Sequence, residues 1–156
     1  MSQGNRISKI LVPIDGSDSS FRAALFAVDI AHKYESELIL TYMIEIIPTL
    51  TSFGLGNFGI SYHDFIEKLK DAGRTEAGPW FAKVKEKAKP LNVAVRTEVI
   101  ESPKSLVSDI IGYAEKNGID LIVLGTRGRS GFKRIVLGSV ASGVVTYASC
   151  PVIVVK

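Results

Sequence analysis

Short apolar runs with little alternation constrain the fold of this chain most. Four such runs lie at residues 9–14, 37–44, 121–124 and 152–155. Residues 93–100 form a further run that alternates in part. Uninterrupted apolar runs are typical of strands buried on both faces, as in a parallel sheet. Between the runs, apolar residues recur at helical spacing, for example at Phe21, Ala24 and Val28. This alternation predicts a five-stranded parallel α/β sheet with helices on both faces.

The segments between the strands carry their own signals. A turn and N-cap cluster at residues 15–19 precedes the first helix. Over residues 63–89 one helical phase continues past Pro79, so we expect one long helix kinked there, or two helices that meet there. Asn117 and Gly118 are expected to end the next helix. Residues 46–62 read as an irregular loop with apolar side chains, which either packs against its own domain or acts as a lid or partner contact.

Length and composition narrow the functional classes. The 156 residues suit a single domain over residues 1–156. Nineteen Lys and Arg against sixteen Asp and Glu give a net charge of +3, too weak to indicate nucleic-acid binding. Cys150 has no second cysteine to pair with, and we expect it to be a buried, inert thiol. With no signal-peptide core or membrane-length apolar run, we expect a cytoplasmic protein with no membrane partner.

The segment after the fourth strand has the composition of an anion site. Gly125 and Gly128 permit positive φ and a close approach of an anion to the backbone. Gly138 and Ser139 open the last helix, where free amides and the helix dipole attract phosphate. The basic residues between these glycines are Arg127, Arg129, Lys133 and Arg134. The pattern favours a polyphosphate ligand; the alternative is a solvated basic loop.

Asp15 follows the first strand directly. A carboxylate there can accept hydrogen bonds from ribose hydroxyls; the alternative is an Asx-turn or a helix cap. Ligands bind beyond the carboxyl ends of parallel strands, where the strand order reverses. If the first and fourth strands are neighbours at that point, Asp15 and the glycine loop face one crevice, which favours a nucleotide.

The spacing Gly125-x2-Gly128-x9-Gly138-Ser139 resembles the ATP-binding signature of the universal stress protein family. KILVPIDGSDSS and GSVASGVVTYASCPVIVVK resemble that family's first and last segments, so the resemblance covers essentially the whole chain. It implies strand order 3-2-1-4-5 and binding of ATP, or of AMP or ADP, with Mg²⁺. It also implies a homodimer formed by antiparallel pairing of Val152 to Val155, an apolar edge strand that needs cover on physical grounds too.

The resemblance also implies roles for particular residues. The backbone of Met43 would hydrogen-bond the adenine base, and Pro13 and Asp15 would line the ribose pocket. The phosphates would be surrounded, largely through backbone amides, by Gly125, Arg127, Gly128, Gly138, Ser139 and Val140.

The chain departs from the family pattern at three points, one of which is a loop at residues 46–62 that is richer in glycine and aromatic residues than usual. Ser142 and Gly143 stand where a charged pair is common, and Gly143 should weaken the last helix by roughly 1 kcal/mol. Glu101 stands where a glycine often precedes the turn at Pro103, and an acid there would be expected to crowd or repel phosphate.

The sequence shows no pattern typical of a catalytic site. It contains no Ser-His-Asp pattern, HExxH or Walker loop, so we name no catalytic residue and no metal ligand. An ATP-binding regulatory or stress-response module is favoured over an enzyme, with slow ATPase activity at most. One alternative is an enzyme of the adenine-nucleotide hydrolase superfamily, which splits ATP between its α and β phosphates; residues 15–19 only echo its SGGxDS turn. Another is a nucleotide-free interaction protein that uses residues 46–62.

Overall fold

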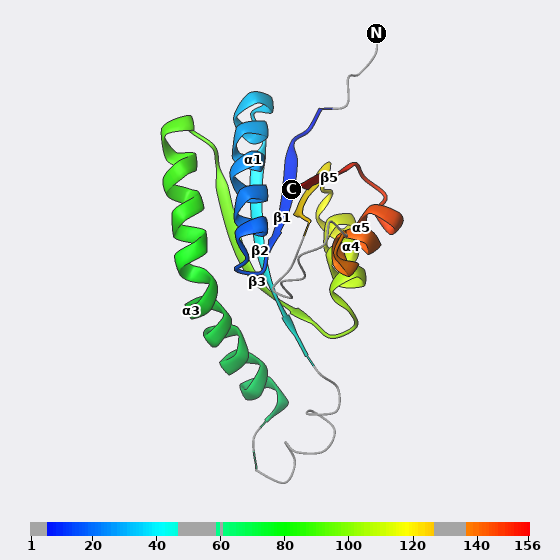
Figure 1. Ribbon diagram of the computed structural model, residues 1–156. Helices are drawn as coiled ribbons and strands as arrows, with labels where there is room; N and C mark the ends of the chain where they lie inside the picture. Colours follow the sequence, from blue (N-terminus) through cyan, green and yellow to red (C-terminus); the bar gives the residue numbers. More distant parts are fainter. Residues whose placement is uncertain (1–5, 47–58, 60, 127–136) are drawn as a thin grey trace.

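The computed structural model describes residues 6–46, 59, 61–126 and 137–156. Its sheet is parallel throughout, and the strand order is β3-β2-β1-β4-β5 (Figure 1). Both the parallel sheet and the 3-2-1-4-5 order are confirmed. The strands are β1 (Lys9–Ile14), β2 (Glu37–Glu45), β3 (Val95–Ser102), β4 (Leu121–Gly125) and β5 (Val152–Val155).

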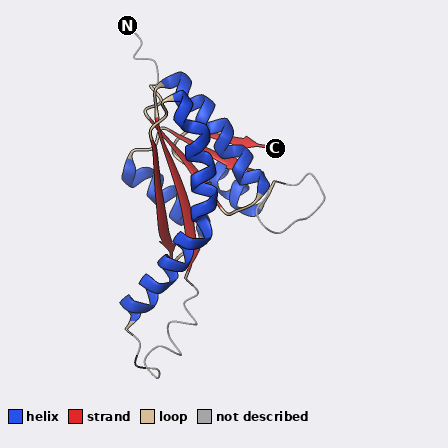
Figure 2. Cartoon of the chain, turned by 90° about the vertical axis from the view of Figure 1, so that its left-hand side faces the viewer, coloured by secondary structure: helices blue, strands red, loops and turns tan. Residues whose placement is uncertain are grey.

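Helices cover both faces of the sheet, as expected (Figures 1 and 2). One face carries α1 (Asp18–Tyr34) and α3 (Tyr62–Ala88), which runs into a short 3-10 turn, η2 (Lys89–Leu91). The other face carries α4 (Leu106–Asn117) and α5 (Ser139–Tyr147). No described helix is both long and apolar enough to cross a membrane.

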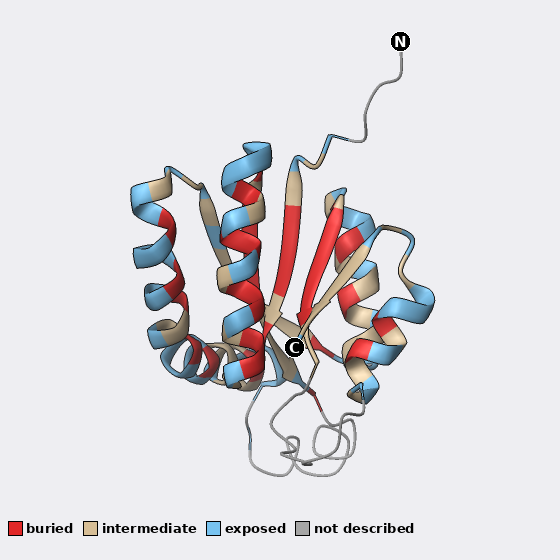
Figure 3. Ribbon diagram, turned by 45° about the horizontal axis from the view of Figure 1, so that its top comes forward, coloured by how far each residue is buried: buried red, intermediate tan, exposed pale blue. Residues whose placement is uncertain are grey.

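Each strand residue faces one of two cores because side chains alternate across a strand. On β1, Ile10 and Val12 pack with α1 and α3, whereas Leu11 packs with α4 and α5. All three are fully buried, which is why the strand reads as an unbroken apolar run. Figure 3 shows that the buried residues lie on the central strands and on the inner faces of the helices.

Helix α3 is continuous across Pro79, which confirms one helix rather than two; the kink at Pro79 stays a prediction. Pro79 lies inside it, and its buried positions are Ile66, Gly73, Ala77, Phe81, Val84 and Ala88. Gly73 allows the helix to approach the sheet closely, because a Cβ there would lie 2.8 Å from Ile44 Cδ1 and 3.0 Å from Val99 Cγ1. The first turns of α3 extend past the carboxyl end of β1 (Figure 1). The expected loop at residues 46–62 lies almost entirely outside the described residues.

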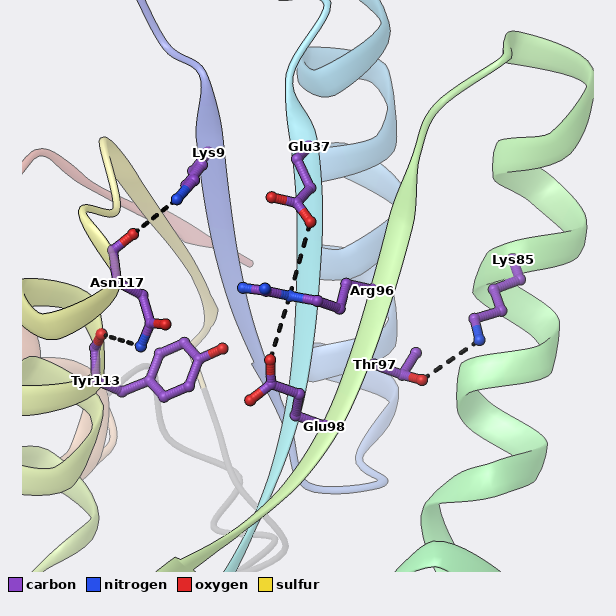
Figure 4. Close-up of polar contacts among 8 residues, drawn as sticks. All are labelled: Lys9, Glu37, Lys85, Arg96, Thr97, Glu98, Tyr113 and Asn117. Carbon is purple, nitrogen blue, oxygen red and sulfur yellow. Dashed lines mark hydrogen bonds and ion pairs between the residues drawn. The ribbon is translucent and has the colours of Figure 1, made fainter.

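A charged cluster occupies the amino ends of β2 and β3, on the face that carries α4 (Figure 4). Arg96 Nε lies 3.6 Å from Glu37 Oε1 and 3.2 Å from Glu98 Oε1. Tyr113 of α4 points toward this cluster (Figure 4). Burial, with a smaller contribution from Glu98, raises the pKa of Tyr113 to about 12. This cluster lies toward the amino ends of the strands, whereas parallel sheets bind ligands at their carboxyl ends.

Candidate nucleotide-binding site

A cavity of about 600 Å³ lies at the carboxyl edge of the sheet. It is walled by the ends of β1, β2 and β4 and by parts of α1, α3, α4 and α5. This is the place where an open parallel sheet binds ligands. The lining residues include Pro13, Asp15, Ser20, Met43, Leu106, Ile110, Leu124, Gly125, Thr126, Gly138, Ser139, Val140 and Ala141.

The cavity opens because β1 and β4 separate. β1 pairs with β2 along its whole length, to Ile14 opposite Tyr42. Its pairing with β4 ends at Leu11 opposite Ile122. Pro13 lies just beyond that point and has no N–H to donate across the gap. The strand order reverses between β1 and β4, and the cavity lies where the pairing of these two strands ends.

Seven of the nine residues named from the sequence line this cavity. They are Pro13, Asp15, Met43, Gly125, Gly138, Ser139 and Val140. Arg127 and Gly128 lie outside the described residues, as do the other three basic residues of that loop. Asp15 and the start of α5, which lie far apart in the sequence, thus share one cavity.

Asp15 forms an Asx-turn, which was the alternative to a ribose-binding role in the sequence analysis. Its Oδ1 accepts hydrogen bonds from Ser17 N at 3.0 Å and Ser17 Oγ at 2.6 Å. The cap of α1 is Ser17 itself, whose Oγ accepts from Ser20 N at 3.1 Å. The turn engages one carboxylate oxygen and fixes the side chain beside the cavity. The second oxygen has no partner among the described residues, so the turn and ligand binding are compatible.

Gly125 is a glycine for a different reason from the one expected. The expected positive φ is wrong, since among described glycines φ is positive at Gly16, Gly59 and Gly118. A Cβ on Gly125 would lie 2.7 Å from the carbonyl carbon of Ser19 on α1. The glycine therefore allows β4 and the first turn of α1 to approach each other at the cavity wall.

The start of α5 differs from the starts of α1 and α4. Ser17 and Ser105 cap those helices through side-chain oxygens, whereas the α5 N-cap is Gly138, with no side-chain cap from any described residue. The first N–H groups of a helix have no partner within it. Ser139, Val140 and Ala141 contribute such groups and line the cavity.

The Gly138 amide is not one of these open donors. It donates to Thr126 O at 2.9 Å, and Gly138 O accepts from Ser142 N at 2.9 Å. The expectation that the Gly138 amide points at phosphate is therefore corrected. Gly138 instead ties the start of α5 to the end of β4.

One wall of the cavity was not anticipated from the sequence. It comes from α3, through Leu69, Ala72, Gly73 and Glu76, and from Tyr42, Ile44 and Glu45 at the end of β2. The periodicity of residues 63–89 indicated a helix but not its extension past the sheet. Among the described lining residues, the charged side chains are those of Asp15, Glu45 and Glu76.

Glu101 does not line this cavity. Its carboxylate lies 3.0 Å from Lys70 Nζ on α3, and this contact raises the pKa of Lys70. The pair joins the end of β3 to α3. The expectation that Glu101 crowds or repels phosphate is therefore corrected, because its charge is paired outside the cavity wall.

Neither a metal centre nor a reactive thiol emerges from the described side chains. Within residues 6–46, 59, 61–126 and 137–156, no group of three or more His, Cys, Asp or Glu side chains could hold a metal ion. Cys150 is only partly buried, so the expectation of a buried thiol is corrected; even so, burial raises the pKa of the thiol, with smaller contributions from Asp120 and Glu115. A raised pKa disfavours the nucleophilic thiolate.

The fold and the cavity define a doubly wound α/β protein with a cavity at its topological switch point. Residues 6–156 match the model of the universal stress protein family, and the chain belongs to that family. It is 41% identical over 152 residues to the universal stress protein MJ0531 of Methanocaldococcus jannaschii, covering 97% of this chain and 84% of that protein.

Solved structures agree on the fold. The universal stress protein UspA from Lactobacillus plantarum superimposes with a TM-score of 0.72 at 30% identity, over 97% of this chain and 99% of the other. A universal stress protein in complex with cAMP superimposes with a TM-score of 0.69 at 23% identity, over 97% and 98% of the two chains. At 23% identity, this second similarity shows only that the two chains share a fold.

Proposed function

We propose that this protein is a single-domain, nucleotide-dependent regulatory module that binds ATP, or another adenine nucleotide, in the cavity at the switch point. The observation that carries the proposal is the joint presence of Asp15 and the uncapped start of α5 in one cavity. Carboxylates accept hydrogen bonds from ribose hydroxyls, and free helix amides bind phosphate. The cAMP complex of a family member supports the class of ligand.

The proposed ligand lies across the gap between β1 and β4. The base lies toward the end of β2, where the backbone of Met43 binds it. The ribose contacts Pro13 and the free oxygen of Asp15. The phosphates meet the amides of Ser139 and Val140, with the Ser139 hydroxyl beside them, and the glycine loop at Gly125, Arg127 and Gly128 completes the site. Gly138 contributes by holding α5 in place.

Mg²⁺ would accompany the nucleotide rather than occupy a protein cage. Magnesium is commonly held by nucleotide phosphates, water and one or two carboxylates. Among the described residues, no group of three or more His, Cys, Asp or Glu side chains could hold the ion by itself.

Regulation would follow from a difference in nucleotide affinity between two states of the protein. We propose that one of these states is a homodimer formed by antiparallel pairing of β5. Its four residues are half-buried and form one edge of the sheet. Unpaired edges of this kind are templates for pairing with another chain. The last residues of β4 line the cavity and pair with β5, which links the ligand to that edge.

Calorimetric titration of the purified protein with ATP, with and without Mg²⁺, tests the proposal, with adenosine as the comparison ligand. ATP should bind more tightly than adenosine, because adenosine makes no contact with the start of α5. Equal affinities, or no heat with either ligand, would contradict the proposal.

A further inference from the structure

The contact between α4 and α5 passes through a glycine. A Cβ on Gly143 would lie 2.7 Å from Cγ2 and 2.9 Å from Cγ1 of Val107, and 3.4 Å from its Cβ. Real Cβ atoms almost never come within 3.0 Å of a heavy atom that is remote from them along the chain. The side chain at residue 143 therefore determines how closely α5 approaches α4.

Val107 is poorly suited to give way. Both of its methyl groups face residue 143, and β-branched side chains in helices strongly prefer one χ1 rotamer. Val107 is also packed against the core that contains Ile110 and Val144. A larger residue at 143 would therefore move α5 rather than the valine.

Movement of α5 would reach the cavity directly. Gly143 lies one turn after Ser139 and Val140 on a helix of nine residues. Those two residues line the cavity, as does Leu106, the neighbour of Val107 on α4. The contact between Gly143 and Val107 is therefore about one helical turn from Ser139 and Val140, whose amides lie at the cavity.

We infer that Gly143 is a positioning residue for phosphate: by lacking a side chain it lets α5 lie against Val107 at the spacing that aims the Ser139 and Val140 amides into the cavity. The inference rests on the proposed function. It also accounts for a glycine at a helical position where glycine costs roughly 1 kcal/mol relative to alanine.

The test compares Gly143→Ala with Gly112→Ala, with ATP and adenosine as probes. Gly112 lies on α4, and a Cβ there would have nothing within 4 Å. Gly143→Ala should bind ATP about tenfold more weakly, the order expected for one lost charge-assisted hydrogen bond. Its affinity for adenosine should not change. Gly112→Ala should match the wild type with both ligands.

A second substitution distinguishes a misplaced α5 from a general loss of structure in Gly143→Ala. Adding Val107→Ala to Gly143→Ala removes both methyl groups that the new Cβ would meet, so ATP affinity should return toward the wild-type value. If Gly143→Ala does not fold, Val107→Ile enlarges the same contact from the α4 side, and it should weaken ATP binding while adenosine binding is kept.

Three results would overturn the inference: unchanged ATP affinity in the variant that enlarges the contact, an equal loss of ATP and adenosine binding, or no rescue by Val107→Ala. A wild-type protein that binds ATP no better than adenosine would instead refute the proposed function. The two failures are therefore distinguishable.

Discussion

Gly125 at the end of β4 and Ser19 in the first turn of α1 lie so close together that a Cβ on the glycine would be 2.7 Å from the Ser19 carbonyl carbon. The nearby atoms of Ser19 include its backbone, which cannot rotate away as a side chain can. This contact holds the Asp15 turn and the end of β4 on the two sides of one cavity.

Gly125→Ala should therefore destabilise the fold by about 1–3 kcal/mol, the usual cost of overpacking. Urea unfolding followed by circular dichroism measures the change. Gly112→Ala is the matched control, because its Cβ enters open space and should be neutral or stabilising. Equal stability of the two variants would show that the close approach does not constrain the fold.

Asp15→Ala should remove the preference for ribose hydroxyls. We expect the affinity of Asp15→Ala for ATP to be about tenfold lower than that of the wild type, the order expected for one lost hydrogen bond to a charged group. The wild type and Asp15→Ala should bind 2′,3′-dideoxy-ATP equally well, and Asp15→Ala should bind ATP no better than this analogue. Ser17→Ala removes the hydroxyl contact to Asp15 and the α1 cap, but it keeps the carboxylate and its hydrogen bond from the Ser17 amide. It should lower stability by about 1 kcal/mol and still distinguish the two ligands. A preference for ATP that survives in Asp15→Ala would refute the ribose role.

The backbone register of β5 identifies a substitution that affects only its outer edge. Pro151 O accepts a hydrogen bond from Ile122 N of β4, and Val155 O accepts one from Thr126 N, the residue that follows β4; both are 3.0 Å long. Alternate residues of a strand point their backbone groups to opposite sides, so the Val154 amide faces away from β4. Val154→Pro should therefore convert the proposed dimer to a folded monomer, whereas Val154→Ala should remain dimeric. Light scattering during gel filtration measures this, and a dimeric proline variant would exclude pairing through this edge.

Alkylation of Cys150 should be slow at neutral pH. Burial raises its pKa above the ordinary value of 9.0, so the midpoint of the rate of iodoacetamide labelling should lie above pH 9.0. Because the pKa of the thiol is higher in the folded than in the unfolded state, the protonated thiol stabilises the fold below pH 9.0. This stabilisation is lost as the pH rises through the folded-state pKa. A midpoint at or below pH 9.0 would contradict this account; the Cys150→Ser variant gives the background.

Local patterns in the sequence predicted the strands and the helices, whereas the strand order was implied by the resemblance to the universal stress protein family. Unbroken apolar runs such as 9–14 reflect burial on both faces, and a helical phase that continued past Pro79 correctly indicated one helix. These features depend on neighbouring residues, which a sequence displays directly.

The details of the site depended on contacts that the sequence does not display. Gly125 looked like a conformational glycine, but it is constrained by Ser19, more than a hundred residues earlier. The sequence indicated that Gly143 weakens the last helix, but it did not indicate that Gly143 packs against Val107. The wall that includes Glu76 was missed because the reach of α3 past the sheet depends on how the helix packs.

The most direct test of nucleotide binding removes one amide from the start of α5. Proline is well tolerated at the first helical position, and the extended backbone of Gly138 (φ −58°, ψ 154°) suits the residue before a proline. Ser139→Pro therefore removes an N–H and a hydroxyl with little effect on the helix, while Ser139→Ala removes the hydroxyl alone.

Calorimetric titration with ATP should show a lower affinity for Ser139→Pro than for Ser139→Ala, by about tenfold, with adenosine affinity equal in both. If the two variants bind ATP equally well, the start of α5 does not hold the phosphates, and the account of this cavity is contradicted.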